Sequence, residues 1–169
     1  MNNYSERSQY YQYEFITKDD FPLIRYVLQM GNGPVIEIPC GSGRLLDLHS
    51  EHKREVYMVD LESRMIDHCK KNILVKGLES RVSAIIGNMI NWYSPIKVEL
   101  VMIPRGGLQL LRSRDEIKAT LYNANKNLAS RGIIYIDIAD PWNASVENLD
   151  LLPEFMRFIE SRVLEGSSQ

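Results

Sequence analysis

The chain has 169 residues, of which 44% are hydrophobic and 25% are charged, and its formal net charge is −2 at pH 7. This length and composition suit one globular domain with its own core and exclude collagen-like, low-complexity and globally disordered proteins. The balanced, well-mixed charges disfavour a nucleic-acid-binding protein, and no apolar stretch approaches the roughly 20 residues that a membrane span needs.

The first seven residues, MNNYSER, lack the basic-then-apolar layout of a secretory leader, so we expect a cytoplasmic protein. Cys40 and Cys69 make neither a CxxC pair nor a disulfide framework, and Cys40 is interpreted as a small packing residue. His49 and His52 have the spacing of one helix face. Because no further ligand accompanies them, solvated surface histidines are favoured over a zinc site.

The chain begins with a segment, residues 1–18, in which aromatic side chains are concentrated at Tyr4, Tyr10, Tyr11, Tyr13 and Phe15. A helix is predicted over residues 19–30, because Asp19 or Asp20 can cap it and Pro22 falls in its first turn. Its apolar residues recur three and four positions apart, at Leu23, Tyr26, Val27 and Met30.

Short apolar runs then alternate with helical patterns. The predicted strands are 35–38, 56–60, 82–86, 98–103 and 133–138. The predicted helices are a short one ending near residue 50, one over 63–76 with Ser63 as cap and Gly77 at its end, one over 113–128 opened by Ser113-x-x-Glu116 and ended by Gly132, and a last one within 141–165. This alternation predicts an α/β fold, a doubly wound, mostly parallel sheet of five to six strands with helices on both faces. Ligands of such sheets bind at the carboxyl ends of the strands.

A glycine-containing turn follows the first predicted strand. Gly41 and Gly43 let a ligand approach the backbone, and the next helix offers free N–H groups to a negative group. Glu37, at the end of the strand, is placed to take an ammonium group. The turn is either a nucleotide-type cofactor loop or an ordinary strand-to-helix connection.

Asp60, at the end of the second predicted strand, favours the cofactor loop. A carboxylate there can accept hydrogen bonds from both hydroxyls of a ribose. Leu46 stands where the dinucleotide fingerprint requires a third glycine, which disfavours a nicotinamide oxidoreductase.

The run Glu37-Ile38-Pro39-Cys40-Gly41-Ser42-Gly43, together with Asp60, resembles the class I, Rossmann-like family of S-adenosylmethionine-dependent methyltransferases. Glu37, Gly41 and Gly43 match the family's first motif, and Pro39 replaces its first glycine. The resemblance implies that S-adenosylmethionine is the cofactor and that Asp60 binds its ribose.

The resemblance extends to the adenine side of the cofactor site. It implies that Asn88 hydrogen-bonds the adenine amino group and that the backbone of Met89 faces the ring. For Gly87-Asn88 the alternative is an ordinary turn. Leu61 and Met65 would supply apolar walls, with helix core as the alternative interpretation.

The family's fourth motif corresponds to the run from Pro104, beside the transferred methyl group. Arg105 is either a cation that holds a carboxylate or phosphate of the substrate or a surface residue of a loop. Asp137 and Asp140 would bind a substrate amine or act as base, and Asp140 before a proline is also an ordinary turn residue. Tyr11, a third candidate base, lies in the aromatic segment, which is either a lid over the cofactor or a helix packed on the domain.

We therefore expect a single domain over 1–169, with a lid at 1–18, a cofactor-binding core at 19–140 and a short extension at 141–169. The extension leaves no room for the family's complete final hairpin, so we expect a homodimer or a terminal helix over the exposed sheet edge. The leading hypothesis is methyl transfer to N or O of a small-molecule acceptor. The alternative is a non-catalytic module that binds S-adenosylmethionine and serves as a partner subunit.

Overall fold

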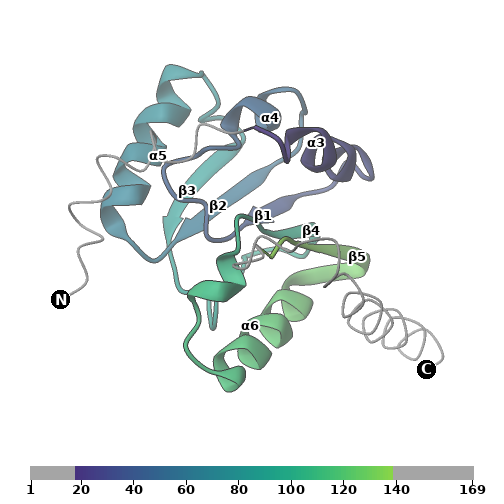
Figure 1. The fold of residues 1–169 in the computed structure, drawn as a ribbon. Coiled ribbons are helices and arrows are strands. Elements are labelled where there is room, and N and C mark those ends of the chain that lie inside the picture. The colour runs from purple at the N-terminus through teal and green to yellow at the C-terminus, as the bar shows by residue number, and fades with distance from the viewer. Residues whose placement is uncertain (1–17, 139–169) are drawn as a thin grey trace. The chain divides into compact units, whose positions relative to one another are not determined.

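The computed structural model describes residues 18–138. The predictions for the aromatic segment with Tyr11, for Asp140 and for the helix within 141–165 lie outside these residues. The described part contains one sheet of five parallel strands in the order β3-β2-β1-β4-β5 (Figure 1). The strands are β1 (Val35–Glu37), β2 (Val56–Asp60), β3 (Val82–Ile86), β4 (Val98–Ile103) and β5 (Leu128–Ile136). The predicted α/β fold with a parallel sheet is confirmed.

The strand order reverses beside β1, which lies between β2 and β4. Glu37 at the end of β1 is in register with Met58 of β2 and Met102 of β4. The loops that follow these three strands therefore meet at one edge of the sheet. Ligands of open α/β sheets bind in the crevice at this reversal.

Helices cover both faces of the sheet. α3 (Phe21–Gln29), α4 (Leu46–Ser50) and α5 (Ser63–Val75) lie on one face, and α6 (Arg114–Asn127) lies on the other (Figure 1). Each face has its own apolar cluster, because β1, β2 and β4 send side chains to both sides. A short 3₁₀ helix, η1 (Gly107–Leu110), follows β4.

The prediction of which apolar residues of α3 face the core is wrong in part. The helix buries Phe21, Ile24, Val27 and Leu28, whereas Leu23, Tyr26 and Met30 are exposed. The helix is apolar on two sides, so the spacing of the exposed set also fits a helical period. Pro22 does fall in the first turn, but the side chain of Asp20 makes no cap hydrogen bond.

The predicted caps are confirmed in part. Ser113 caps α6, because its hydroxyl accepts a hydrogen bond from the backbone N–H of Glu116 at 3.2 Å. The carboxylate of Glu116 accepts from the N–H of Arg112 instead of completing the capping box. α5 has Glu62, not Ser63, at its cap position, and Gly77 follows it with φ +63°.

The prediction that Gly132 ends α6 is wrong, although the predicted last residue, Leu128, lies one residue from the observed end. The helix ends at Asn127, and β5 begins at once with Leu128. Leu128 pairs with Val98 and Ile133 pairs with Leu100, so residues 129–132 form an irregularity in the strand. Gly132 therefore lies inside β5 and does not end the helix, and the regular ladder starts at Ile133, where the strand was predicted to begin.

Candidate active site

The turn after β1 and the acid after β2 are joined by a hydrogen bond. The backbone N–H of Gly41, a residue with φ +55°, donates to Oδ2 of Asp60 at 2.8 Å, and the N–H of Glu62 donates to Oδ1 at 3.0 Å. Asp60 is only 8% exposed, and burial raises the pKa of its carboxyl although both N–H groups act to lower it. The backbone N–H of Leu61 also acts to lower this pKa, and a carboxylate with about four acceptor sites can still accept from a ligand besides these three donors.

Glu37 lies beneath this turn and is paired within the protein. Its Oε2 is 2.7 Å from Nε2 of His49 on α4, and both side chains are buried. The prediction that His49 is a solvated surface histidine is wrong, because α4 turns it towards the end of β1. Residue spacing in the sequence gives no sign of this pair, since its members lie on different elements.

Cys40 and Gly43, two residues of the loop after β1, pack closely against Cys69 of α5. Cys40 and Cys69 are buried free thiols, and burial, together with contact with Cys69, raises the pKa of the Cys40 thiol well above its usual value. This agrees with a packing role for Cys40. Gly43 has φ +94°, and a Cβ there would lie 2.6 Å from Cδ1 of Leu46. Glycine is therefore required at this position by the packing of the loop itself.

The residues expected around the adenine are divided between surface and core. Leu61, next to Asp60, is 62% exposed, whereas Met65 is buried, as the helix-core interpretation has it. The N–H of Gly87 donates to the backbone oxygen of Asp60 at 2.9 Å, which places the start of the next loop beside β2. Asn88 is half-buried, and its Oδ1 accepts from the N–H of Ile90 at 2.9 Å.

The loop after β4 is tied to the end of β5. Arg105 and Gly106 both have positive φ, +56° and +65°, and the N–H of Gly106 donates to Oδ1 of Asp137 at 2.7 Å. The hydroxyl of Tyr135 is 3.3 Å from the other oxygen of Asp137, and burial and the nearby carboxylate raise the pKa of Tyr135 to about 12. Pro104 is buried and Arg105 is exposed. The structure thus holds the loop that carries Arg105 against Asp137 through the neighbouring Gly106.

An ion pair that the sequence did not predict forms between Asp20 and Arg44. Arg44 binds both carboxylate oxygens of Asp20, at 2.9 and 2.5 Å, and its guanidinium lies 5.3 Å from the ring centre of Phe21. Burial acts to raise the pKa of Asp20, but hydrogen bonds and charge from Arg44, with a contribution from Arg105, leave that pKa lowered. The ion pair therefore joins the start of α3 to the loop that follows β1.

Residues 18–138, the described part of the chain, contain no group of three or more His, Cys, Asp or Glu side chains arranged to hold a metal ion. No helix within these residues is long and apolar enough to cross a membrane.

Comparison with known proteins gives a family. A family model described as a methyltransferase domain matches residues 35–132, which is more than half of the chain, so the chain belongs to the S-adenosylmethionine-dependent methyltransferase family. The comparison with curated proteins gives no match.

Solved structures share the fold. An S-adenosylmethionine-dependent methyltransferase from Clostridium acetobutylicum has a TM-score of 0.64 and 18% identity, covering 81% of this chain and 58% of its own. One from Thiobacillus denitrificans, in complex with S-adenosylhomocysteine, has a TM-score of 0.56 and 20% identity, covering 71% and 48%. CalS10, an amino pentose methyltransferase from Micromonospora echinaspora with bound S-adenosylmethionine, has a TM-score of 0.61 and 15% identity, covering 75% and 52%. The chain spans about half the length of these proteins.

The residues at the carboxyl edge fit the family's cofactor. Asp60 offers a buried carboxylate with remaining acceptor capacity, directly beside the turn at Gly41. Leu61 offers an exposed apolar side chain next to it. Glu37 has one carboxylate oxygen left to bind the ammonium group of the cofactor, because His49 contacts the other.

Proposed function

We propose that this protein is an S-adenosylmethionine-dependent methyltransferase that transfers a methyl group to N or O of a small-molecule acceptor. The observation that carries the proposal is the hydrogen bond between Gly41 and Asp60, which joins the glycine turn and the ribose acid into one unit. The likeness to CalS10, an amino pentose methyltransferase, supports a small-molecule acceptor.

In this proposal the cofactor is bound by residues from three loops. Asp60 would accept hydrogen bonds from the ribose hydroxyls, while Gly41, Gly43 and Pro39 form the turn that faces the methionine part. Glu37 would take the ammonium group through the oxygen that His49 leaves free. The residues proposed for the adenine are Leu61, Met65, Asn88 and Met89, of which Met65 is buried and Leu61 exposed.

The acceptor would enter beside the loop that begins at Pro104. The cofactor supplies a methyl group already activated on a sulfonium, so the main task of the protein is to align the two reactants, which contributes about 7–11 kcal/mol in well-oriented reactions. Arg105 would hold an anionic group of the acceptor, and Asp137 would orient an amine or hydroxyl. Asp137 already accepts two hydrogen bonds, which suits orientation better than proton removal. Tyr11 and Asp140 remain proposed catalytic groups, and a cytoplasmic homodimer remains the proposed state.

The first experiment is calorimetric titration of the protein with S-adenosylmethionine and S-adenosylhomocysteine. We expect micromolar binding that Asp60→Ala abolishes. Asp67→Ala, which removes an exposed carboxylate on α5, is the matched control and should leave binding unchanged. A folded wild-type protein that binds neither compound would contradict the proposal.

A non-catalytic binding module is the second candidate, because Pro39 replaces the first glycine of the family's motif. Both candidates predict cofactor binding, but only the enzyme forms S-adenosylhomocysteine in the presence of an acceptor. Incubation with S-adenosylmethionine and a panel of amines and hydroxylated compounds separates them. Tight binding without turnover on any acceptor would favour the module.

A further inference from the structure

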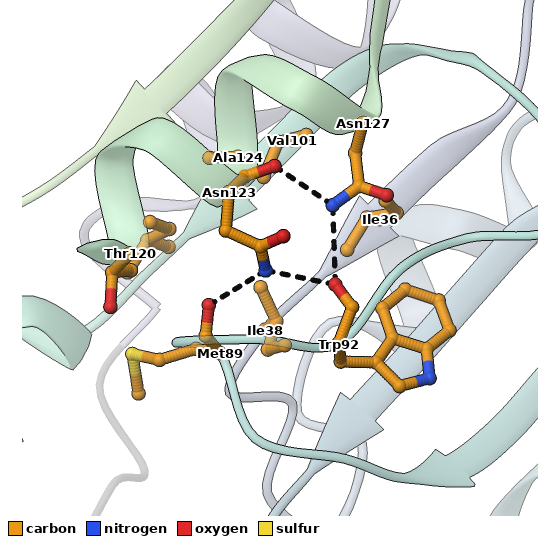
Figure 2. A pocket seen from close by; sticks show the side chains of 10 residues that line it. Ile36, Ile38, Met89, Trp92, Val101, Thr120, Asn123, Ala124 and Asn127 are labelled. Carbon is orange, nitrogen blue, oxygen red and sulfur yellow. Dashed lines mark hydrogen bonds between the residues drawn. The ribbon is translucent and has the colours of Figure 1, made fainter.

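Two buried asparagines of α6 hold the loop between β3 and β4, residues 87–97 (Figure 2). Nδ2 of Asn123 donates to the backbone oxygens of Met89 at 3.0 Å and of Trp92 at 2.8 Å. Asn127 lies one turn further along and donates to Trp92 at 3.3 Å, while its Oδ1 accepts from the N–H of Ser94 at 2.7 Å. The loop is therefore bound to α6 at three backbone positions.

The orientation of the Asn123 amide is fixed by its partners. Both acceptors are carbonyl oxygens, so the amino end must face the loop. Its Oδ1 consequently faces a cavity of about 10 Å³ between α6 and the sheet, where neither it nor the Thr120 hydroxyl has a hydrogen-bond partner among the described residues. Asn123 is 3% exposed, and an unpaired polar atom at such a buried site is destabilising. The amino group of Asn123 therefore binds the loop at a cost in stability, because the oxygen of the same amide has no partner among residues 18–138.

The peptide unit between Met89 and Ile90 is held from two sides. Its oxygen accepts from Asn123, and its N–H donates to Oδ1 of Asn88 at 2.9 Å. Because a peptide unit is planar and rigid, fixing its oxygen also fixes the direction of its N–H. The N–H in turn determines where the side-chain oxygen of Asn88 points, and that oxygen retains a second lone pair.

We propose that Asn123 is a positioning residue for adenine recognition: through the Met89–Ile90 peptide it orients the Asn88 oxygen that accepts the adenine amino group. This inference rests on the proposed function, in which Asn88 contacts that group. Asn123 acts from the interior and does not touch the cofactor. Asn127 holds the same loop but not this peptide, so its removal should not affect the recognition of the amino group.

The test compares S-adenosylhomocysteine with S-inosylhomocysteine, in which an oxygen replaces the adenine amino group. Asn123→Leu should weaken binding of S-adenosylhomocysteine about fivefold, the usual effect of losing one hydrogen bond, and leave S-inosylhomocysteine within about twofold. Asn127→Leu, the matched control, should lower the thermal midpoint but preserve the ratio of the two affinities. An unchanged ratio in a folded Asn123→Leu protein would overturn the inference.

A measurement on the wild-type protein does not depend on the folding of any variant. Hydrogen exchange at the Ile90 amide should slow more with saturating S-adenosylhomocysteine than with saturating S-inosylhomocysteine. Equal protection by both compounds, or equal wild-type affinity for them, would overturn the role of this peptide. A wild-type protein that binds neither compound would instead contradict the proposed function.

Discussion

The contact between Glu37 and His49 can be tested by measuring how much each side chain contributes to the free energy of unfolding. The two side chains meet at 2.7 Å in the interior, beneath the turn that carries Gly41. His49→Ala removes the hydrogen-bond partner and leaves the Glu37 carboxylate buried without it. Glu37→Gln keeps a polar group of the same size, which can still hydrogen-bond the imidazole.

The expected costs follow from this geometry. Removing one partner of a buried charged contact costs about 3–5 kcal/mol, because the other group stays in a nonpolar environment. Glu37→Gln should cost about 1 kcal/mol, the value of one hydrogen bond. The double variant has a cavity but no unpaired carboxylate, so we expect about 3 kcal/mol for it, about 2 kcal/mol less than the sum of the single changes. The loss from His49→Ala alone corresponds to a fall of about 12 °C in the thermal midpoint.

Urea unfolding followed by tryptophan fluorescence measures the four free energies of this cycle. His68→Ala, which removes an exposed histidine of α5, is the control and should change the free energy of unfolding by less than about 0.5 kcal/mol. Additive single effects would refute the argument that the two side chains depend on each other. A His49→Ala protein as stable as wild type would show that Glu37 is solvated or otherwise paired.

Three further predictions concern single positions. Burial raises the pKa of Asp60 above 3.8, so its contribution to stability is present below pH 3.8 and is lost as pH rises through the raised value. Cofactor affinity should depend on pH in the opposite direction, because the ribose hydroxyls need the ionised carboxylate of Asp60 as acceptor. Calorimetry should show that S-adenosylhomocysteine binding weakens as pH falls through that pKa. Asp60→Asn should remove this dependence on pH. Gly107→Ala places a Cβ 2.7 Å from Cδ of Pro39 and should cost about 1–3 kcal/mol by thermal unfolding, against about 1 kcal/mol for Gly77→Ala, where a Cβ meets nothing within 4 Å. Thr120→Val replaces a buried hydroxyl that has no hydrogen-bond partner within residues 18–138 by a methyl group, and it should raise stability by about 1 kcal/mol. A loss of stability in urea unfolding would mean that the hydroxyl is hydrogen-bonded.

The strands were predictable because each is a short apolar run bounded by turn residues. The face of α3 was not, because Leu23 and Ile24 begin two apolar stripes on the same helix. Periodicity shows that both stripes are helical, but only packing against the sheet selects the stripe of Ile24. The start of β5 was missed for a similar reason, since Leu128 pairs with β4 before an irregularity in which Arg131 has φ +65°.

The candidate site was predictable to the extent that its residues follow strands. Gly41 and Asp60 were found by their position at strand ends, and the structure brings them into contact. His49 and Asn123 were missed because each acts on a residue of another element, 12 and 34 positions away in the chain. Such contacts depend on how helices pack on the sheet, and no local spacing records that packing.

Three loops at the carboxyl edge, those after β1, β3 and β4, are each held by a side chain from another part of the fold. Asp60 binds the N–H of Gly41, Asp137 binds the N–H of Gly106, and Asn123 binds the oxygen of Met89. These contacts lie within the protein itself, so they reduce the entropy cost of ordering three separate loops on binding. If the roles proposed above for these loops hold, weakening one of the three contacts should impair recognition of the ribose, the acceptor or the adenine separately, because each contact holds a different loop. The three loops share one edge because the strands are parallel, but each loop is held by a side chain from a different part of the fold.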